Sequence, residues 1–178
     1  ARYSWGTAVL LLLNFKAAFP SVSRKFIWEA LREIGVPGFI ISAIQALYRN
    51  NLHFTSGDVG LLFVFCALAG VRQGCPLSST IFVIATDAIN RALIQKVGPG
   101  NLALMYADDD AICLRNLWES GKELAEFFKS LGKICALWLN KKKCIIIPLG
   151  GWPEDDFQKM VDEQLEEWKD FKIMDHGK

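Results

Sequence analysis

The sequence lacks most of the residue patterns from which common protein sites are built. Its five cysteines form no C-x-x-C pair, and its two histidines, His53 and His176, lie far apart, so no zinc-binding pattern is present. No apolar run reaches the ~20 residues of a membrane span. No phosphate-binding P-loop and no Ser-His-Asp constellation occur either. These absences argue against a zinc protein, a membrane protein, a Ser-His-Asp hydrolase and a P-loop nucleoside triphosphatase.

A large net charge is also absent, but the charge is unevenly distributed. Of the 178 residues, 20 are basic and 19 are acidic. Residues 1–150 hold 16 Lys and Arg against 10 Asp and Glu, a net of +6, whereas residues 151–178 hold 4 against 9, a net of −5. A basic body with an acidic tail is compatible with a polyanionic partner. The 52% hydrophobic content is ample for one globular domain.

The hydrophobic pattern predicts an α+β fold. The continuous apolar run at 7–15 predicts a strand that is buried on both faces. Further strands are expected at about 51–54, 61–68, 102–107, 111–114 and 144–148. Helices are expected at about 24–34, 38–49, 77–96 and 116–137, with another beginning near Pro153.

Three adjacent carboxylates, Asp108, Asp109 and Asp110, join two of the expected strands. An aspartate-rich turn is commonly just a solvated turn. Adjacent like charges repel, however, and a divalent cation between them would relieve that repulsion. From these residues alone, both interpretations stay open.

The residues around this turn resemble a known family. Tyr106-Ala107-Asp108-Asp109 resembles the Y-A-D-D box of reverse transcriptases of the non-LTR (LINE-type) retrotransposons. The segment Gly70 to Ser78 matches that family's G-V-R-Q-G-C-P-L-S box residue for residue, and Leu139-Asn140 with Lys143 resembles its L-N-x-x-K element. The resemblance implies an RNA-directed DNA polymerase, a nucleotidyltransferase, with the fold of a right-hand polymerase palm.

The family's first box, D-x-x-x-A-F-D, is degenerate here. Ala18 and Phe19 keep its frame, but Asn14 and Pro20 stand where the family has aspartates. The resemblance implies that Asp108, Asp109 and the residue at position 14 bind two Mg²⁺ ions, with Mn²⁺ as a substitute, and that both aspartates are catalytic. Asparagine keeps one neutral oxygen but loses the charge, so we expect weaker metal binding and slower catalysis.

Other roles follow from the resemblance, each with a plain structural alternative. Phe19 would exclude a ribose 2′-hydroxyl, or is simply a core aromatic. Gln73 and Gly74 would contact the incoming nucleotide, or form a helix-entry turn. Lys143 would protonate the leaving pyrophosphate, or would contact the phosphate backbone together with Lys141 and Lys142. Arg72 would contact phosphate or template.

The resemblance extends over about residues 8–148. It predicts a palm domain at 1–150 and, at 151–178, an acidic tail that begins the segment leading to a thumb, with fingers and thumb largely missing. The implied partners are an RNA template, a DNA primer and dNTPs, without a membrane, and the implied location is intracellular, nuclear or cytoplasmic. Two functions are expected: a reverse transcriptase impaired by Asn14, or a non-catalytic retrotransposon relic that at most binds nucleic acid.

Overall fold

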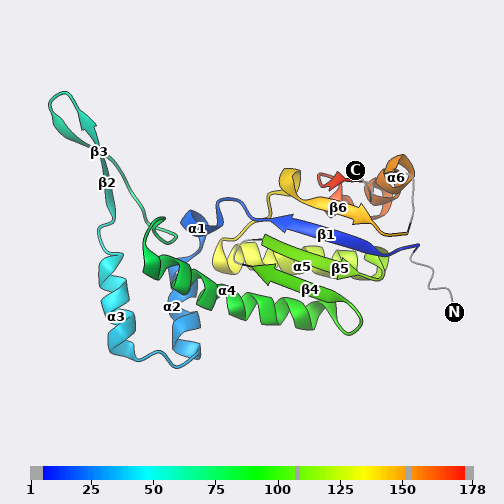
Figure 1. The fold of residues 1–178 in the computed structure, drawn as a ribbon, viewed down its shortest axis with the longest axis horizontal. Coiled ribbons are helices and arrows are strands. Elements are labelled where there is room, and N and C mark those ends of the chain that lie inside the picture. The colour runs from blue at the N-terminus through cyan, green and yellow to red at the C-terminus, as the bar shows by residue number, and fades with distance from the viewer. Residues whose placement is uncertain (1–5, 107–108, 151–153, 175–178) are drawn as a thin grey trace.

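A five-stranded sheet with strand order β4-β5-β1-β6-β7 forms the centre of the molecule (Figure 1). The structure is a computed structural model that describes residues 6–106, 109–150 and 154–174. The first four strands of that order are antiparallel, and β7 pairs in parallel with β6. In chain order the strands of this sheet are β1 (Val9–Asn14), β4 (Leu102–Tyr106), β5 (Asp109–Leu114), β6 (Ile145–Pro148) and β7 (Lys172–Ile173).

Helices and short 3₁₀ turns complete the predicted α+β fold. Ser23 caps the second helix, because its hydroxyl accepts a hydrogen bond from the Phe26 N–H at 3.4 Å. The expected helices are confirmed with ends shifted by a few residues, while the short α1 was not predicted. They are α1 (Ala18–Ser21), α2 (Arg24–Glu33), α3 (Gly38–Leu47), α4 (Pro76–Val97), α5 (Leu117–Cys135) and α6 (Glu154–Gln164), with 3₁₀ turns η1 (Lys141–Lys143) and η2 (Glu166–Trp168).

The central strand β1 has one covered face and one open face. Val9, Leu11 and Leu13 are buried, whereas Leu12 is 36% exposed. Successive side chains of a strand point to opposite faces, so the buried set faces the core and Leu12 lies on the open side. The prediction of burial on both faces is therefore wrong. A run of consecutive leucines is hydrophobic on both faces whether or not both are covered.

The longest helix, α4, belongs to the core. Phe82, Ala85 and Leu93 are fully buried, and α4 packs against α2 and β4. By length and composition alone it would be long and apolar enough to cross a membrane. The burial of these side chains within the domain accounts for part of that apolar composition, since 39% of the apolar window is buried.

The acidic C-terminal segment packs against the body of the domain. Phe157, Val161 and Trp168 are buried within the same hydrophobic cluster as β1 and α5. The Trp168 indole N–H also donates a hydrogen bond to the Gly121 carbonyl at 3.0 Å. The acidic residues therefore occupy the outside of a segment whose apolar side chains complete the core, and the boundary placed at residue 150 stays a prediction.

A separate two-stranded hairpin extends away from the rest of the molecule (Figure 1). It consists of β2 (Leu52–Gly57) and β3 (Gly60–Cys66), which confirms the strands expected at about 51–54 and 61–68. Its apolar side chains are largely in solvent; Leu61 is 74% exposed and Phe63 is 58% exposed.

Candidate active site

Residues of the D-x-x-x-A-F-D box and of the Y-A-D-D box meet on the open face of the sheet. Asn14, the last residue of β1, lies directly opposite Asp109, the first residue of β5. Tyr106 at the end of β4 pairs with Asp109 in turn, so the three residues form one row across three strands. Directly opposed residues project to the same face. Asp108, the other predicted ligand, lies outside the described residues.

Asp110 belongs to the opposite face. It is only 4% exposed and lies opposite Leu13, whose side chain is buried. The three consecutive aspartates therefore do not act as one exposed acidic tip: Asp109 is exposed and Asp110 is buried. The alternation of side chains along β5 separates them.

The backbone at Asn14 is held by the L-N-x-x-K element. The Asn140 N–H donates to the Asn14 carbonyl at 2.7 Å, and the Asn14 N–H donates to Cys144 Sγ at 3.3 Å. Cys144 is fully buried, and this burial raises the pKa of its thiol. Position 14 and the segment 139–144 are thus neighbours in the fold.

The glycine-bearing loop is docked onto the residues that follow Asn14. The Gly70 N–H donates to the Val22 carbonyl and the Val71 N–H donates to the Phe19 carbonyl, both at 2.8 Å. Gly70 has φ +70°, and a Cβ there would lie 2.3 Å from the Pro20 carbonyl carbon and oxygen. Only glycine allows this approach of the two backbones. The segment from Gly70 to Ser78 is therefore fixed against the D-x-x-x-A-F-D segment.

Arg24 binds the backbone of this loop, a role that its local sequence does not predict. Its guanidinium donates to three carbonyls, those of Gly70 at 3.0 Å, Tyr48 at 3.1 Å and Ala69 at 3.2 Å. Partial burial lowers the pKa of Arg24. In the sequence, Arg24 is one basic residue following a helix cap, and nothing local marks it as a clamp between distant segments.

The rest of the loop is open to solvent. Arg72, Gln73 and Gly74 are exposed, and the Arg72 guanidinium carbon lies 6.0 Å from the centroid of the Tyr48 ring. Gly74 has φ +80°, with nothing within 4 Å of where a Cβ would be. A positive φ, and not crowding by neighbouring atoms, therefore favours glycine at position 74. The space beside Gly74 is free.

Phe19 is packed rather than free. It is half-buried, and its ring stacks on Phe82 of α4 with centroids 4.3 Å apart. The stacking agrees with Phe19 as a core aromatic residue. The exposed part of the ring is the part that would exclude a ribose 2′-hydroxyl. The role of Phe19 in excluding a 2′-hydroxyl stays a prediction.

The three consecutive lysines form the 3₁₀ turn η1, beside the end of β1, and all three are exposed. The Lys143 N–H donates to the Asn140 carbonyl at 2.8 Å, which closes the turn. Lys141 lines a cavity that lies next to α5. The turn thus lies against the end of β1, and the chemical roles of its lysines stay predictions.

The donor set at the predicted metal site fits a divalent cation only in part. Among the described residues, no three His, Cys, Asp or Glu side chains gather. The row supplies one carboxylate, Asp109, and one amide oxygen, Asn14, and both are hard oxygen donors of the kind that Mg²⁺ prefers. The described part of the site is therefore one anionic ligand short of a pair of opposed carboxylates.

The sequence and the fold both match known proteins. Residues 2–171 match the family described as reverse transcriptase (RNA-dependent DNA polymerase). The retrovirus-related Pol polyprotein from type-2 retrotransposable element R2DM of Drosophila melanogaster is 29% identical over 147 residues, which are 80% of this chain and 14% of that protein. The Pol polyprotein from type-1 retrotransposable element R2 of Bradysia coprophila is 29% identical over 146 residues, 79% of this chain and 16% of that protein.

A solved structure of telomerase from Candida tropicalis in complex with a TWJ fragment of telomeric RNA superposes with a TM-score of 0.68. The two sequences are 14% identical over 83% of this chain and 27% of the telomerase chain, so this likeness concerns the fold. The predicted polymerase palm is confirmed. The chain spans only a small part of its curated relatives. It belongs to the reverse transcriptase family, as a reverse transcriptase domain of the kind found in non-LTR retrotransposons.

Proposed function

We propose that this chain is the palm of a polymerase that copies RNA into DNA, with a catalytic centre weakened by asparagine at position 14. The observation that carries the proposal is the row on the open face of the sheet, in which Asn14 lies directly opposite Asp109. An aspartate at position 14 would place two carboxylates side by side at the end of the hairpin. Such a pair of anionic side chains is stable only when cations neutralise it.

Asp108, Asp109 and residue 14 are the ligands of the proposed metal site, with Mg²⁺ as the natural ion and Mn²⁺ as a substitute. When bound, two such ions would activate the primer hydroxyl, hold the triphosphate and stabilise the developing charge. Asn14 can offer only one neutral oxygen to this site. Metal affinity, and with it the rate of nucleotidyl transfer, is therefore lower than with aspartate.

The docked loop is the proposed contact surface for the incoming nucleotide. Gln73 and Gly74 are exposed, and the space beside Gly74 is free, so a ligand can approach the backbone there. Arg72 would contact a phosphate of the nucleotide or template. The part of Phe19 that is not packed on Phe82 would oppose a ribose 2′-hydroxyl.

The lysines of η1 are the proposed contacts for the leaving group and the nucleic-acid backbone. Lys143 would donate a proton to pyrophosphate, in the role of a general acid. Lys142 and Lys141 would contribute electrostatic attraction for template or primer phosphates, which depends on salt. An RNA template, a DNA primer and dNTPs are the proposed partners, in an intracellular setting.

Asn14 also favours a second function, a relic that binds nucleic acid without catalysis. Primer extension on an RNA template with Mg²⁺ or Mn²⁺ distinguishes the two. The unmodified chain is compared with Asn14→Asp and with the double variant Asn14→Asp/Asp108→Ala. The proposal expects at least about tenfold more product from Asn14→Asp than from the unmodified chain, and none from the double variant. An unmodified chain as active as Asn14→Asp would contradict the impairment, and an inactive Asn14→Asp variant would favour the relic.

A further inference from the structure

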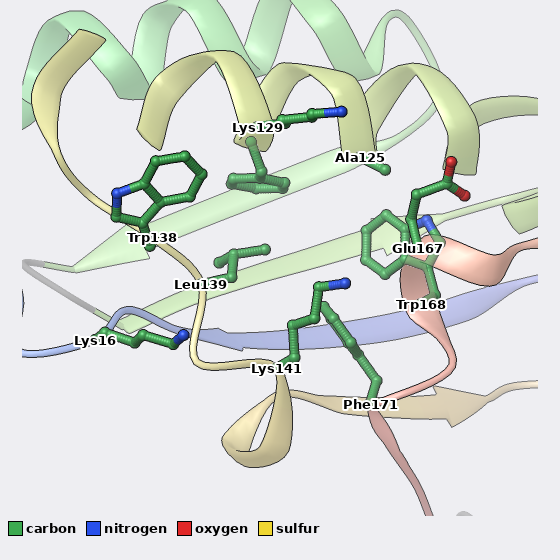
Figure 2. Close-up of a pocket in the computed structure, with 10 residues that line it drawn as sticks. Lys16, Ala125, Lys129, Trp138, Leu139, Lys141, Glu167, Trp168 and Phe171 are labelled. Atoms are coloured by element: carbon green, nitrogen blue, oxygen red, sulfur yellow. The ribbon is translucent and has the colours of Figure 1, made fainter. Parts of the chain in front are cut away.

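A cavity of about 640 Å³ lies between α5, the residues that follow it and the 3₁₀ turn η2 (Figure 2). Its volume is that of a small-molecule site. Aromatic rings and lysines supply most of its lining. The aromatic residues are Phe128, Trp138, Trp168 and Phe171, and the lysines are Lys16, Lys129 and Lys141. We refer to it as the α5 cavity.

The α5 cavity is on the other side of β1 from the proposed catalytic row. Phe15 follows Asn14 and packs on Phe128 of α5, with ring centroids 6.3 Å apart. Neighbouring residues of an extended chain point to opposite faces, so Asn14 projects away from α5. Phe128 lines the cavity and Asn14 does not. A ligand bound here would be separate from one bound at the row of Asn14 and Asp109.

The aromatic walls are held in place by the fold. Trp168 is buried, donates to the Gly121 carbonyl and contacts Phe171, with ring centroids 4.8 Å apart. Trp138, on the other side, is 45% exposed and lies over Gly132, where a Cβ would be 2.5 Å from the indole ring. Gly132 therefore leaves room for the ring. These walls exist without a ligand, which reduces the entropy lost on binding.

The charges around the α5 cavity favour an anion. Three lysines contribute to its lining against one carboxylate, Glu167. Within the described residues, none of the ammonium groups of Lys16, Lys129 and Lys141 forms an ion pair or a hydrogen bond with a side chain. Figure 2 shows these side chains around the space between Trp138 and Trp168. Positive charge and aromatic surface thus adjoin one opening.

We propose that the α5 cavity binds a nucleoside phosphate, either a free nucleotide or the terminal nucleotide of a single strand. The base would lie against Trp138 and the apolar wall, where stacking is tolerant of base identity. The phosphates would lie among the lysines at the rim, as charge-assisted contacts. This second site requires neither the metal ligands nor catalytic activity, and it shares Lys141 with the phosphate contacts of the proposed function.

Isothermal titration calorimetry in EDTA tests the site without a contribution from the metal centre. The unmodified chain is titrated with ATP, with adenosine, with pyrophosphate and with a short 5′-phosphorylated oligothymidylate. We expect ATP or the oligonucleotide to bind at least about tenfold more tightly than adenosine or pyrophosphate. If ATP binds, a free nucleotide is a sufficient ligand for the cavity. If only the oligonucleotide binds, the ligand is the terminal nucleotide of a strand.

Matched variants locate the binding. Lys16→Glu/Lys129→Glu is expected to weaken binding about tenfold or more, whereas Lys122→Glu/Lys133→Glu makes the same charge change at exposed residues outside the cavity and should leave binding within about twofold. Trp138→Ala should weaken ATP about tenfold and leave pyrophosphate unchanged. Thermal unfolding verifies that each variant is folded. Absent binding of both nucleotide ligands, equal losses in the two lysine pairs, or pyrophosphate binding as tight as ATP would overturn the proposal.

Discussion

Asn14 at the end of β1 lies directly opposite Asp109 at the start of β5. Two boxes that are about 95 residues apart in the chain therefore share one row on the open face of the sheet. In the function proposed above, the asparagine lies where a second carboxylate would complete the metal site. Variants can test how the row is positioned, which contacts stabilise the surrounding core and how much metal affinity is lost with asparagine at position 14.

Gly70→Ala is expected to destabilise the domain by about 3 kcal/mol, because a Cβ there combines an unfavourable φ with a collision against the Pro20 backbone. Gly35→Ala is the matched control. Gly35 also has a positive φ, +82°, but nothing within 4 Å of a Cβ, so the substitution should cost only about 1 kcal/mol. Urea unfolding measures both. Equal losses would show that the contact between loop and Pro20 contributes nothing beyond backbone strain.

Arg24→Lys should destabilise the domain by about 1–2 kcal/mol, because an ammonium group cannot reproduce the guanidinium contacts to the carbonyls of Gly70, Tyr48 and Ala69. The amide protons of Gly70 and Val71 should also exchange faster. Arg32→Lys alters an exposed pair with Glu29 and should change stability by less than about 0.5 kcal/mol. Unchanged exchange in Arg24→Lys would contradict the clamp.

Cys75 should be alkylated before the buried cysteines, and at a lower pH than an ordinary thiol. The Ser78 hydroxyl, followed by backbone N–H groups at the start of α4, lowers the pKa of Cys75, so its thiolate forms earlier as pH rises. Burial instead raises the pKa of Cys135 and Cys144. Mass spectrometry after iodoacetamide treatment at several pH values gives the order. Ser78→Ala should shift the Cys75 profile toward higher pH, and an unshifted profile would exclude the hydroxyl as the cause.

Trp168→Ala should destabilise the domain by about 3–5 kcal/mol, because the indole is buried and bonded to the Gly121 carbonyl. Trp138→Ala removes the same side chain at a site that is 45% exposed and should cost less. Chemical unfolding gives both values. A small loss at Trp168 would mean that the acidic segment is an appendage rather than part of the core.

The local features of the fold could be predicted from the sequence, whereas the contacts between distant segments could not. Helix periodicity, the Ser23 cap and the two hairpins are visible over a few residues each. The family boxes also indicated which residues would be neighbours. A Cβ at Gly70 would collide with the Pro20 backbone, and Arg24 donates to carbonyls of distant segments. Both contacts depend on backbones far away in the sequence, so no local pattern predicts them. The open face of β1 was missed for a similar reason, since coverage of a strand depends on how helices pack.

The net charge of the C-terminal segment describes only part of its character. A count of −5 over residues 151–178 predicts an acidic tail. Phe157, Val161 and Trp168 are nevertheless buried in the main core. Charge counts describe the exposed side of an amphipathic segment and say nothing of its buried side.

Mn²⁺ binding, followed by electron paramagnetic resonance of the free ion, tests the central claim most directly, because it requires neither template nor primer. Asn14→Asp should bind Mn²⁺ at least about tenfold more tightly than the unmodified chain. Asn50→Asp, which adds the same charge at an exposed residue elsewhere, should bind as the unmodified chain does. The gain should vanish when Asp108 and Asp109 are also replaced by alanine. An Asn14→Asp variant with unchanged affinity, or a gain that persists without these aspartates, would contradict a metal site weakened at position 14.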